Sequence, residues 1–456
     1  MTEENHESRE QLSQYPLLRA LQGRRSRRFG RGMKIGGGPL AYESAHPPQP
    51  LSEAEEAALA FAACGITGHA LADLDYGPGQ GGSMLAGMVG RTIASPDTVN
   101  TVALIVTNDE ATYLVKRPRD FSPAELADLI LLSKADELTE IYRRSRIKIM
   151  DGRAAPPIEP VLNFDINKWS LYAKGGTYFI PINCMTEIYI NVLLAVFDPE
   201  SGLFARDERN FFRPAGVKRF GKKKGGTLDD SMTGGRLFTI QALESSLKES
   251  VSVEQGMMLQ NLALMAQALG LGGFPNYARH PNCWFEALDF RMGKVPGTRF
   301  FGGPYWLSKI INWIGLQTFV PIPLGLERDG TALLKPYCPP YYSSMKEAVY
   351  ALVEHKFGPQ GVYRGAAQHN SGWQDPAGVT KQIAGPSDAA VDATVAYCEY
   401  VYKRYGHFPA FSAPFRTVIG YQATHVDTDF YDRFYKPEAI TDSQRRHQDS
   451  WHAQKG

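Results

Sequence analysis

Apolar side chains recur along the 456-residue chain at two spacings, which predict helices in some segments and strands in others. The strongest helical pattern covers residues 252–269, where Leu259, Leu262 and Ala266 fall on one stripe. Gly270 follows directly and is a natural stop for the helix. This segment is therefore expected to be a long helix that buries one side.

A β-hairpin is predicted in the first third of the chain. Residues 101–107 form an alternating apolar segment of strand length. Asn108 and Asp109 supply a plausible turn, and residues 112–115 form the return strand.

Helix starts are marked by serine caps and by proline at the first helical position. Ser52 and Glu55 make a capping box ahead of an alanine-rich helix, which Gly65 ends. Further helices are predicted at 17–22, from Ser122 to about Arg146, from Ser344 to Gly358 and from Ser387 to Gly406. Helices interspersed with short strands indicate an α+β fold.

The composition indicates a large folded protein without extreme charge. Hydrophobic residues make up 43% of the chain, charged residues 21%, and the net charge is +1, which excludes disorder and a chain-wide field for nucleic acids. The five cysteines are scattered without a C-x-x-C pair, which favours a reducing compartment over a disulfide framework. The polar N-terminus is no signal peptide, and no apolar run reaches the roughly 20 residues of a membrane span. We therefore expect a cytoplasmic protein without membrane contact.

A dense basic cluster near the N-terminus is the first candidate for chemistry. It reads GRRSRRF at residues 23–29 and holds four arginines and a serine. Guanidinium groups bind phosphate oxygens in pairs, and the serine hydroxyl adds a further hydrogen bond. The same run is equally compatible with a solvated basic surface or a nucleic-acid arm, because short basic clusters are common.

Two further pieces consist of glycines and hydroxyl residues. The helix at 252–269 ends in the sequence GLGG at 270–273, where the missing side chains let the backbone approach a planar group. By itself this helix indicates only a core element. The segments GITG at 65–68 and GRTIASPDTVN at 90–100 can offer N–H and O–H groups to a polar ligand, or form an ordinary surface loop.

Together these pieces resemble the nitroreductase superfamily. The pattern R-R-S-x-R-F at 24–29 is similar to the family's motif for the FMN phosphate and pyrimidine edge. The helix end A-L-G-L-G-G is similar to the family's long central helix. The run from GITG to GRTIASPDTVNTVALIVTND resembles the branch that contains the thiazole/oxazole dehydrogenases of peptide natural-product synthesis. The resemblance covers residues 15–115 and 245–345.

The resemblance implies an FMN-dependent oxidoreductase with a nitroreductase-like fold, in which helices flank a central mixed sheet and two FMN molecules lie at a homodimer interface. Hydride passes from NAD(P)H or an organic substrate to the flavin and on to an acceptor. Carried over by position, Arg24, Arg25, Ser26 and Arg28 contact FMN, Ser95 and Asn100 approach it from the loop, and Gly270, Leu271 and Gly272 lie beside the ring. Replacing Arg27, the unmatched position of the motif, is expected to change neither FMN retention nor the flavin reduction potential much. No catalytic triad is visible, since the cofactor carries the chemistry.

Three regions are expected from this resemblance. Residues 1–15 form a flexible tail, residues 16–345 the nitroreductase-like FMN-binding core, and residues 346–456 a helical C-terminal extension that walls the pocket. Residues 207–236 are rich in glycine and lysine, so we expect a mobile insertion with little apolar burial near the pocket mouth. The substrate is expected to be a small molecule or a natural product.

Other signals are weaker. The pattern G-x-G-x-x-G at 77–82 lacks a convincing preceding strand, which favours a flexible loop over a Rossmann site. His425, Asp427, Asp429 and Asp432 match neither an EF-hand loop nor a zincin motif. We therefore expect a polar surface or a tyrosine-rich interface there and no metal site.

Two rival hypotheses stay open. The family has Pro-Ser where this chain has Ala94-Ser95-Pro96, which motivates a flavin-free scaffold or binding protein of the same fold. The basic arm Arg24–Arg31 motivates a nucleic-acid-associated protein, which the near-neutral net charge weakens.

Overall fold

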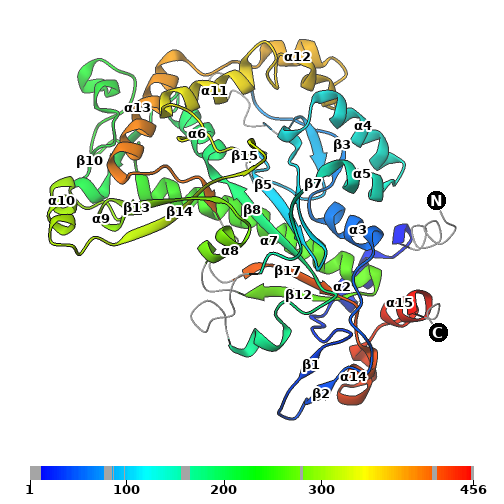
Figure 1. Ribbon diagram of the computed structural model, residues 1–456. Helices are drawn as coiled ribbons and strands as arrows, with labels where there is room; N and C mark the ends of the chain where they lie inside the picture. Colours follow the sequence, from blue (N-terminus) through cyan, green and yellow to red (C-terminus); the bar gives the residue numbers. More distant parts are fainter. Residues whose placement is uncertain are drawn as a thin grey trace.

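A sheet of seven strands forms the centre of the protein in the computed structural model, with the strand order β12-β17-β8-β5-β6-β7 and with β16 paired to β8 (Figure 1). Its strands are β5 (Val102–Thr107), β6 (Ala111–Val115), β7 (Arg146–Asp151), β8 (Thr177–Cys184), β12 (Gly272–Tyr277), β16 (Phe411–Ser412) and β17 (Val418–Thr424). The structure describes residues 12–76, 85, 87–96, 98–155, 165–277, 281–412 and 418–452. The predicted glycine-rich loop at 77–82 and most of the predicted tail lie outside these residues.

The predicted hairpin is confirmed as β5 and β6, which pair antiparallel with Leu104 opposite Val115. Successive residues of a strand point to opposite faces of the sheet. Leu104 and Val106 accordingly pack into a core with α3 (Glu53–Cys64) and α7 (Ile240–Leu269), while Ala103 and Ile105 pack into a second core with α8 (Pro281–Ala287). β5 is buried at every position because both faces are covered.

The described residues form helices α2 to α15, and some of these helices cover the two faces of the sheet (Figure 1). The helices are α2 (Leu17–Gly23), α3 (Glu53–Cys64), α4 (Pro123–Lys134), α5 (Leu138–Ser145), α6 (Met185–Val196), α7 (Ile240–Leu269), α8 (Pro281–Ala287), α9 (Gly297–Phe300), α10 (Tyr305–Trp313), α11 (Met345–Phe357), α12 (Pro376–Gln382), α13 (Asp388–Tyr405), α14 (Thr428–Phe434) and α15 (Asp442–His452). The starts and stops predicted for α2, α3, α11 and α13 are confirmed within one or two residues. Local capping signals therefore located these helices correctly.

Two helices differ from the prediction. The helix expected from Ser122 to about Arg146 is divided into α4 and α5, and Asp136 between them has a positive φ of 55° that an α-helix excludes. α7 begins with Thr239 as its N-cap, well before residue 252, because Leu243 and Leu247 continue the buried stripe through a polar segment. It ends, as predicted, at Gly270, whose φ is 80°.

The central sheet is not mixed as expected. Its described strands pair with one another in antiparallel fashion throughout. β8 lies between β5 and β17, which come from distant parts of the chain. Both of these neighbouring strands run opposite to β8. The coarser expectation, an α+β protein whose sheet is flanked by helices, is confirmed.

The segment 207–236 has its own structure. It contributes to a small sheet ordered β10-β9-β11, and Ala215, Val217 and Leu228 are fully buried in the largest core. The expectation of little apolar burial is therefore wrong, because these three apolar side chains reach inward between exposed lysines. The remaining short strands are β1 (Lys34–Ile35), β2 (Tyr42–Glu43), β3 (Ile66–His69), β4 (Val89–Arg91), β9 (Phe204–Asp207), β10 (Arg213–Pro214), β11 (Leu237–Thr239), β13 (Arg291–Pro296), β14 (Phe319–Arg328) and β15 (Thr331–Leu334).

The predicted boundary at residue 345 does not separate a core from an extension. β17, which follows that boundary, lies between β12 and β8 in the central sheet. The C-terminal helix α15 then packs against α7 and lies close to α2 (Figure 1). None of the described helices is both long and apolar enough to cross a lipid bilayer.

Candidate functional site

The basic cluster lies in an extended segment that leaves α2 and passes the end of β12. Arg27 forms a backbone bridge with Gly273, whose N–H donates to the Arg27 carbonyl at 2.9 Å. Phe29 is 1% exposed and stacks on Phe430 with a centroid distance of 4.1 Å. The backbone of the motif is thus fixed at two points.

Arg27 is the inward-facing arginine, with 2% of its surface exposed. Its Nε donates to the Ala439 carbonyl at 2.7 Å and its Nη1 to Gln267 Oε1 at 2.8 Å. Burial lowers the pKa of this guanidinium. This side chain joins the N-terminal segment to α7 and to the C-terminal segment, a structural role that the motif did not indicate.

Arg28 is half-buried between two aromatic rings. Its guanidinium carbon lies 4.2 Å from the ring centre of Phe274 and 5.3 Å from that of Trp169, and Nη2 donates to Ser170 Oγ at 3.0 Å. Burial lowers the pKa of Arg28. The structure therefore holds this cation in a defined orientation on the sheet edge at β12.

The other motif residues face outward. Arg25 and Ser26 are exposed, and Arg24 is partly exposed. Arg25 donates to the carbonyls of Gln22 and Arg24 at 3.1 and 2.8 Å. The four arginines therefore do not converge on one point.

The predicted loop residues Ser95 and Asn100 lie against α7. Ser95 Oγ donates to Glu254 Oε1 at 2.5 Å, and Thr101 Oγ1 donates to Glu254 Oε2 at 3.0 Å. Asn100 adopts a left-handed conformation with φ of 52°, and its N–H donates to Ser95 Oγ at 3.4 Å. Glu254, which is 1% exposed, therefore ties this loop to the middle of the helix.

The turn Gly270-Leu271-Gly272 is approached closely by the chain itself. A Cβ atom on Gly270 would lie 2.3 Å from the Ser443 carbonyl oxygen, and one on Gly272 would lie 2.7 Å from the Arg27 carbonyl oxygen. Leu271 is 2% exposed. The backbone of the turn is thus approached closely, as expected, but on the sides where those Cβ atoms would point the approaching groups are α15 and the arginine segment of the same chain.

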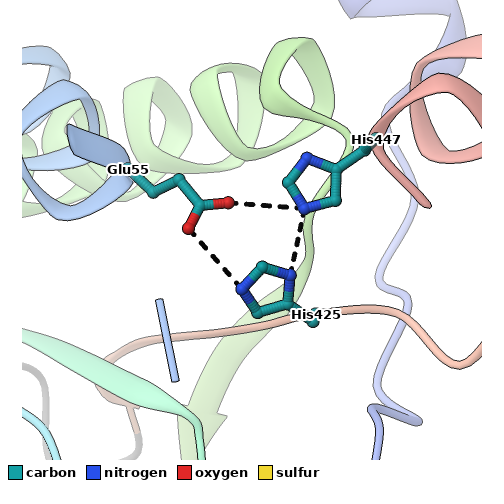
Figure 2. Close-up of side chains that lie close together, drawn as sticks. All are labelled: Glu55, His425 and His447. Atoms are coloured by element: carbon teal, nitrogen blue, oxygen red, sulfur yellow. Dashed lines mark hydrogen bonds and ion pairs between the residues drawn. The ribbon is translucent and has the colours of Figure 1, made fainter. Parts of the chain in front are cut away.

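Three buried residues converge nearby that the sequence pattern did not connect. Figure 2 shows Glu55 from α3, His425 from the segment after β17, and His447 from α15. His447 Nε2 lies 3.0 Å from His425 Nδ1 and 3.4 Å from Glu55 Oε1, and His425 Nε2 lies 3.5 Å from Glu55 Oε2. One ligand atom from each side chain lies within 4.8 Å of the other two, a distance suited to a shared metal ion after small movements.

In this cluster the pKa values of Glu55 and His447 are both lowered, which favours a charged carboxylate beside a neutral imidazole. Burial by itself raises the pKa of Glu55, but His425, His447 and hydrogen bonds outweigh it and hold this pKa at about 2. Burial lowers the pKa of His447 to about 4, despite the opposing effect of Glu55. At neutral pH Glu55 is therefore charged and His447 is a neutral imidazole.

The expectation of a polar surface at residues 425–432 is wrong for its first half. His425 and Asp427 are each 1% exposed, whereas Asp429 and Asp432 lie at the surface. Asp427 caps α14 by accepting from the Phe430 N–H at 3.1 Å. A local spacing rule could not find the cluster, because its members lie on three separate elements.

A second acidic and histidine cluster is more open. His46 Nε2 lies 2.9 Å from Asp429 Oδ2, and Ser44 Oγ donates to Asp427 Oδ2 at 2.5 Å. His46 and Asp429 are each partly exposed, with 31% and 53% of their side-chain surface accessible. Water can therefore reach His46 and Asp429, which makes their contact a solvent-accessible one.

No protein-family model matches the chain, and no curated protein matches it. Functional inference therefore depends on the arginine motif and on the described side chains.

Proposed function

We propose that the chain is an FMN-dependent oxidoreductase of nitroreductase type that acts on a small-molecule or natural-product substrate. The observation that carries this proposal is the difference in burial among the residues of the arginine motif. Arg27 fixes the backbone from inside, while Arg25 and Ser26 are exposed and Arg28 is half-buried beside β12. A surface site for a phosphate needs such a frame, because its ligands must be held by their supporting contacts.

Arg28 is suited to the flavin end of such a site. Its orientation is set by Trp169, Phe274 and Ser170, so it presents a positioned cation in a partly apolar environment. FMN, when bound, supplies hydride transfer with NAD(P)H or an organic substrate. A fixed cation near its pyrimidine edge favours the reduced, anionic flavin. Arg24, Arg25 and Ser26 are assigned to the phosphate and the ribityl chain.

A second copy of the chain is part of the proposal. Ser95 is tied to Glu254, which precedes Gly270 by 16 positions on α7 (270 − 254). At 1.5 Å per residue these positions lie roughly 24 Å apart along the helix. A compact site that includes both the Ser95 loop and the Arg28 edge is therefore easier to build between two antiparallel copies of α7 than within one chain.

The test is flavin content. The purified protein is expected to be yellow and to release FMN, not FAD, on denaturation. Arg25→Ala should weaken FMN binding about ten- to a hundred-fold, since one charge-assisted hydrogen bond contributes about 1.5–3 kcal/mol. Arg19→Ala, an exposed arginine of α2 outside the motif, is the matched control and should keep its flavin. A colourless protein that FMN does not reconstitute contradicts the proposal.

The alternative is a flavin-free scaffold of the same fold. It is favoured by the loop and the glycine turn, since the Ser95 hydroxyl is bound to Glu254 and the faces of Gly270 and Gly272 are covered by the chain. Equal, weak FMN binding by the wild-type protein and by Arg25→Ala would support this alternative.

A further inference from the structure

We propose that Glu55, His425 and His447 bind one divalent transition-metal ion, for which Zn²⁺ is the probe, and that this ion fastens α15 to the body of the protein. The three side chains come from α3, from the end of β17 and from α15, and point at one another (Figure 2). The proposal does not depend on flavin binding.

The donor set and its spacing fit such an ion. Two imidazoles and one carboxylate are ligands that zinc and its neighbours in the first transition row accept. A tetrahedral ion with bonds near 2.1 Å holds neighbouring ligand atoms about 3.4 Å apart. His447 Nε2 already lies 3.4 Å from Glu55 Oε1 and 3.0 Å from His425 Nδ1. The donor atoms already lie within 4.8 Å of one another, so small shifts of the side chains, without a change of rotamer, would bring them to the metal.

Supporting contacts already orient two of the three ligands. The ring of His447 hydrogen-bonds the Leu269 carbonyl at the end of α7, while its Nε2 faces the cluster. The carboxylate of Glu55 accepts from Ser52 N at 2.7 Å and from Ser52 Oγ at 2.9 Å. Metal-binding histidines and carboxylates in proteins are held by outer contacts of this kind, which fix the tautomer and the direction of the lone pair.

Burial gives the ion a structural role. Glu55 and His425 are each 1% exposed and His447 is 7% exposed, so a substrate does not reach them. The ion would join a helix near residue 55 to a helix near residue 447, which lie nearly the whole chain apart in sequence. A cross-link of this span stabilises the folded state because the unfolded chain does not hold the ligands together. Three protein ligands leave one coordination position for water.

Direct measurement on the full-length protein tests the proposal. After chelator treatment and dialysis, titration with Zn²⁺ should give one tightly bound equivalent per chain, and Co²⁺ should give the visible d–d absorption of a low-coordinate nitrogen and oxygen site. Adding Zn²⁺ should raise the melting temperature of the metal-free protein. Wild-type protein that takes up no Zn²⁺ above a surface background, and shows no cobalt spectrum, overturns the proposal.

Two variants locate the ion. His447→Gln should weaken Zn²⁺ binding at least tenfold and remove the Zn²⁺-dependent rise in melting temperature. His46→Gln, in the open pair with Asp429, is the matched control and should bind Zn²⁺ like the wild type. If His46→Gln loses the ion and His447→Gln keeps it, the assignment is wrong. His425→Gln provides a second test of the same ligand set should His447→Gln fold poorly.

Discussion

Burial, more than residue type, decides what each arginine of the N-terminal motif does. Arg25 and Arg27 are two positions apart, yet Arg25 is exposed and Arg27 is 2% exposed. The Arg27 N–H donates to the Arg25 carbonyl at 3.1 Å, so the chain turns tightly at Ser26 and does not continue as a regular strand, in which both side chains would share one face. Beyond this turn one arginine meets water and the other meets the protein. A charged group inside the protein is stable only when its hydrogen bonds are satisfied, and Gln267 and the Ala439 carbonyl serve Arg27 in this way.

Arg27→Ala is expected to lower the free energy of unfolding by about 2–4 kcal/mol, because several hydrogen bonds are lost and the buried Gln267 Oε1 loses the Arg27 donor. Urea denaturation followed by circular dichroism measures this change. Arg25→Ala, its exposed neighbour, should change stability by no more than about 0.5 kcal/mol. Equal effects of the two substitutions would contradict the distinction drawn between them.

Lys356 on α11 is another buried cation, and here burial makes the protonation state of the side chain depend on pH near neutrality. The residue is 3% exposed, and its ammonium group donates to Asn191 Oδ1. Burial lowers the pKa of Lys356 from 10.5 to about 7, although Glu187 opposes the shift. Between these two pH values the unfolded chain binds a proton that the folded protein does not, so this group makes the folded state more stable as pH rises through that window and adds no further slope below it.

The unfolding free energy of the wild type minus that of Lys356→Met should therefore rise with pH, by up to about 1.4 kcal/mol per unit between pH about 7 and about 9. The wild type gains stability over this range and the methionine variant, which has no proton to lose there, does not. Below that range the two stability curves should run parallel. Lys346→Met, which removes an exposed lysine of the same helix, serves as the reference and should show no such divergence. Parallel curves over the whole range would mean that Lys356 keeps an ordinary pKa in the folded protein.

At the scale of elements, the positions of helix ends follow from nearby residues in the sequence, whereas the contacts between helices do not. Ser52 and Glu55 cap α3 as their spacing predicts, and Ser344 and Ser387 begin α11 and α13. The end of α7 was also predicted from Gly270. What the turn packs against was not, because Ser443 arrives there from the last helix of the chain.

Gly270→Ala is expected to destabilise the protein by about 2–5 kcal/mol. Alanine is strained at the observed φ of 80°, and its Cβ would overlap the Ser443 carbonyl. Gly256 lies inside the same helix with open space around its Cβ position, so Gly256→Ala should stabilise by about 0.5–1 kcal/mol. Thermal unfolding of both variants checks the pair, and a harmless Gly270→Ala would show that α15 is loosely attached.

At the scale of the whole molecule, α7 has an apolar face that remains exposed in one chain. Val253 and Met257 are 39% and 38% exposed although they lie one turn apart on the long central helix. Three leucines of α2, a helix in contact with α7, are also exposed: Leu17, Leu18 and Leu21. Val253 and Met257 form an exposed apolar pair on one side of α7, which is consistent with the proposed homodimer.

Met257→Lys is expected to convert the dimer into a monomer, because a charge would be placed in the apolar contact between two copies of α7. Light scattering at micromolar concentration measures the mass, and flavin content should fall together with it. Tyr350→Lys, at a similarly exposed position of α11, is the control and should leave the dimer intact. A wild-type chain that is monomeric with FMN fully bound would disprove the two-chain site.

The sequence alone determined the local structure of this protein: the capping boxes, the glycine stops and the β5–β6 hairpin, all of which depend on residues only a few positions apart. It also indicated the α+β class and the arginine motif, whose FMN ligand stays a prediction. The tertiary structure decided the rest. β17 enters the middle of the sheet from the far end of the chain, Arg27 turns inward, and His447 meets Glu55. These contacts depend on which surfaces are buried together, and no local spacing encodes the partner of a residue hundreds of positions away.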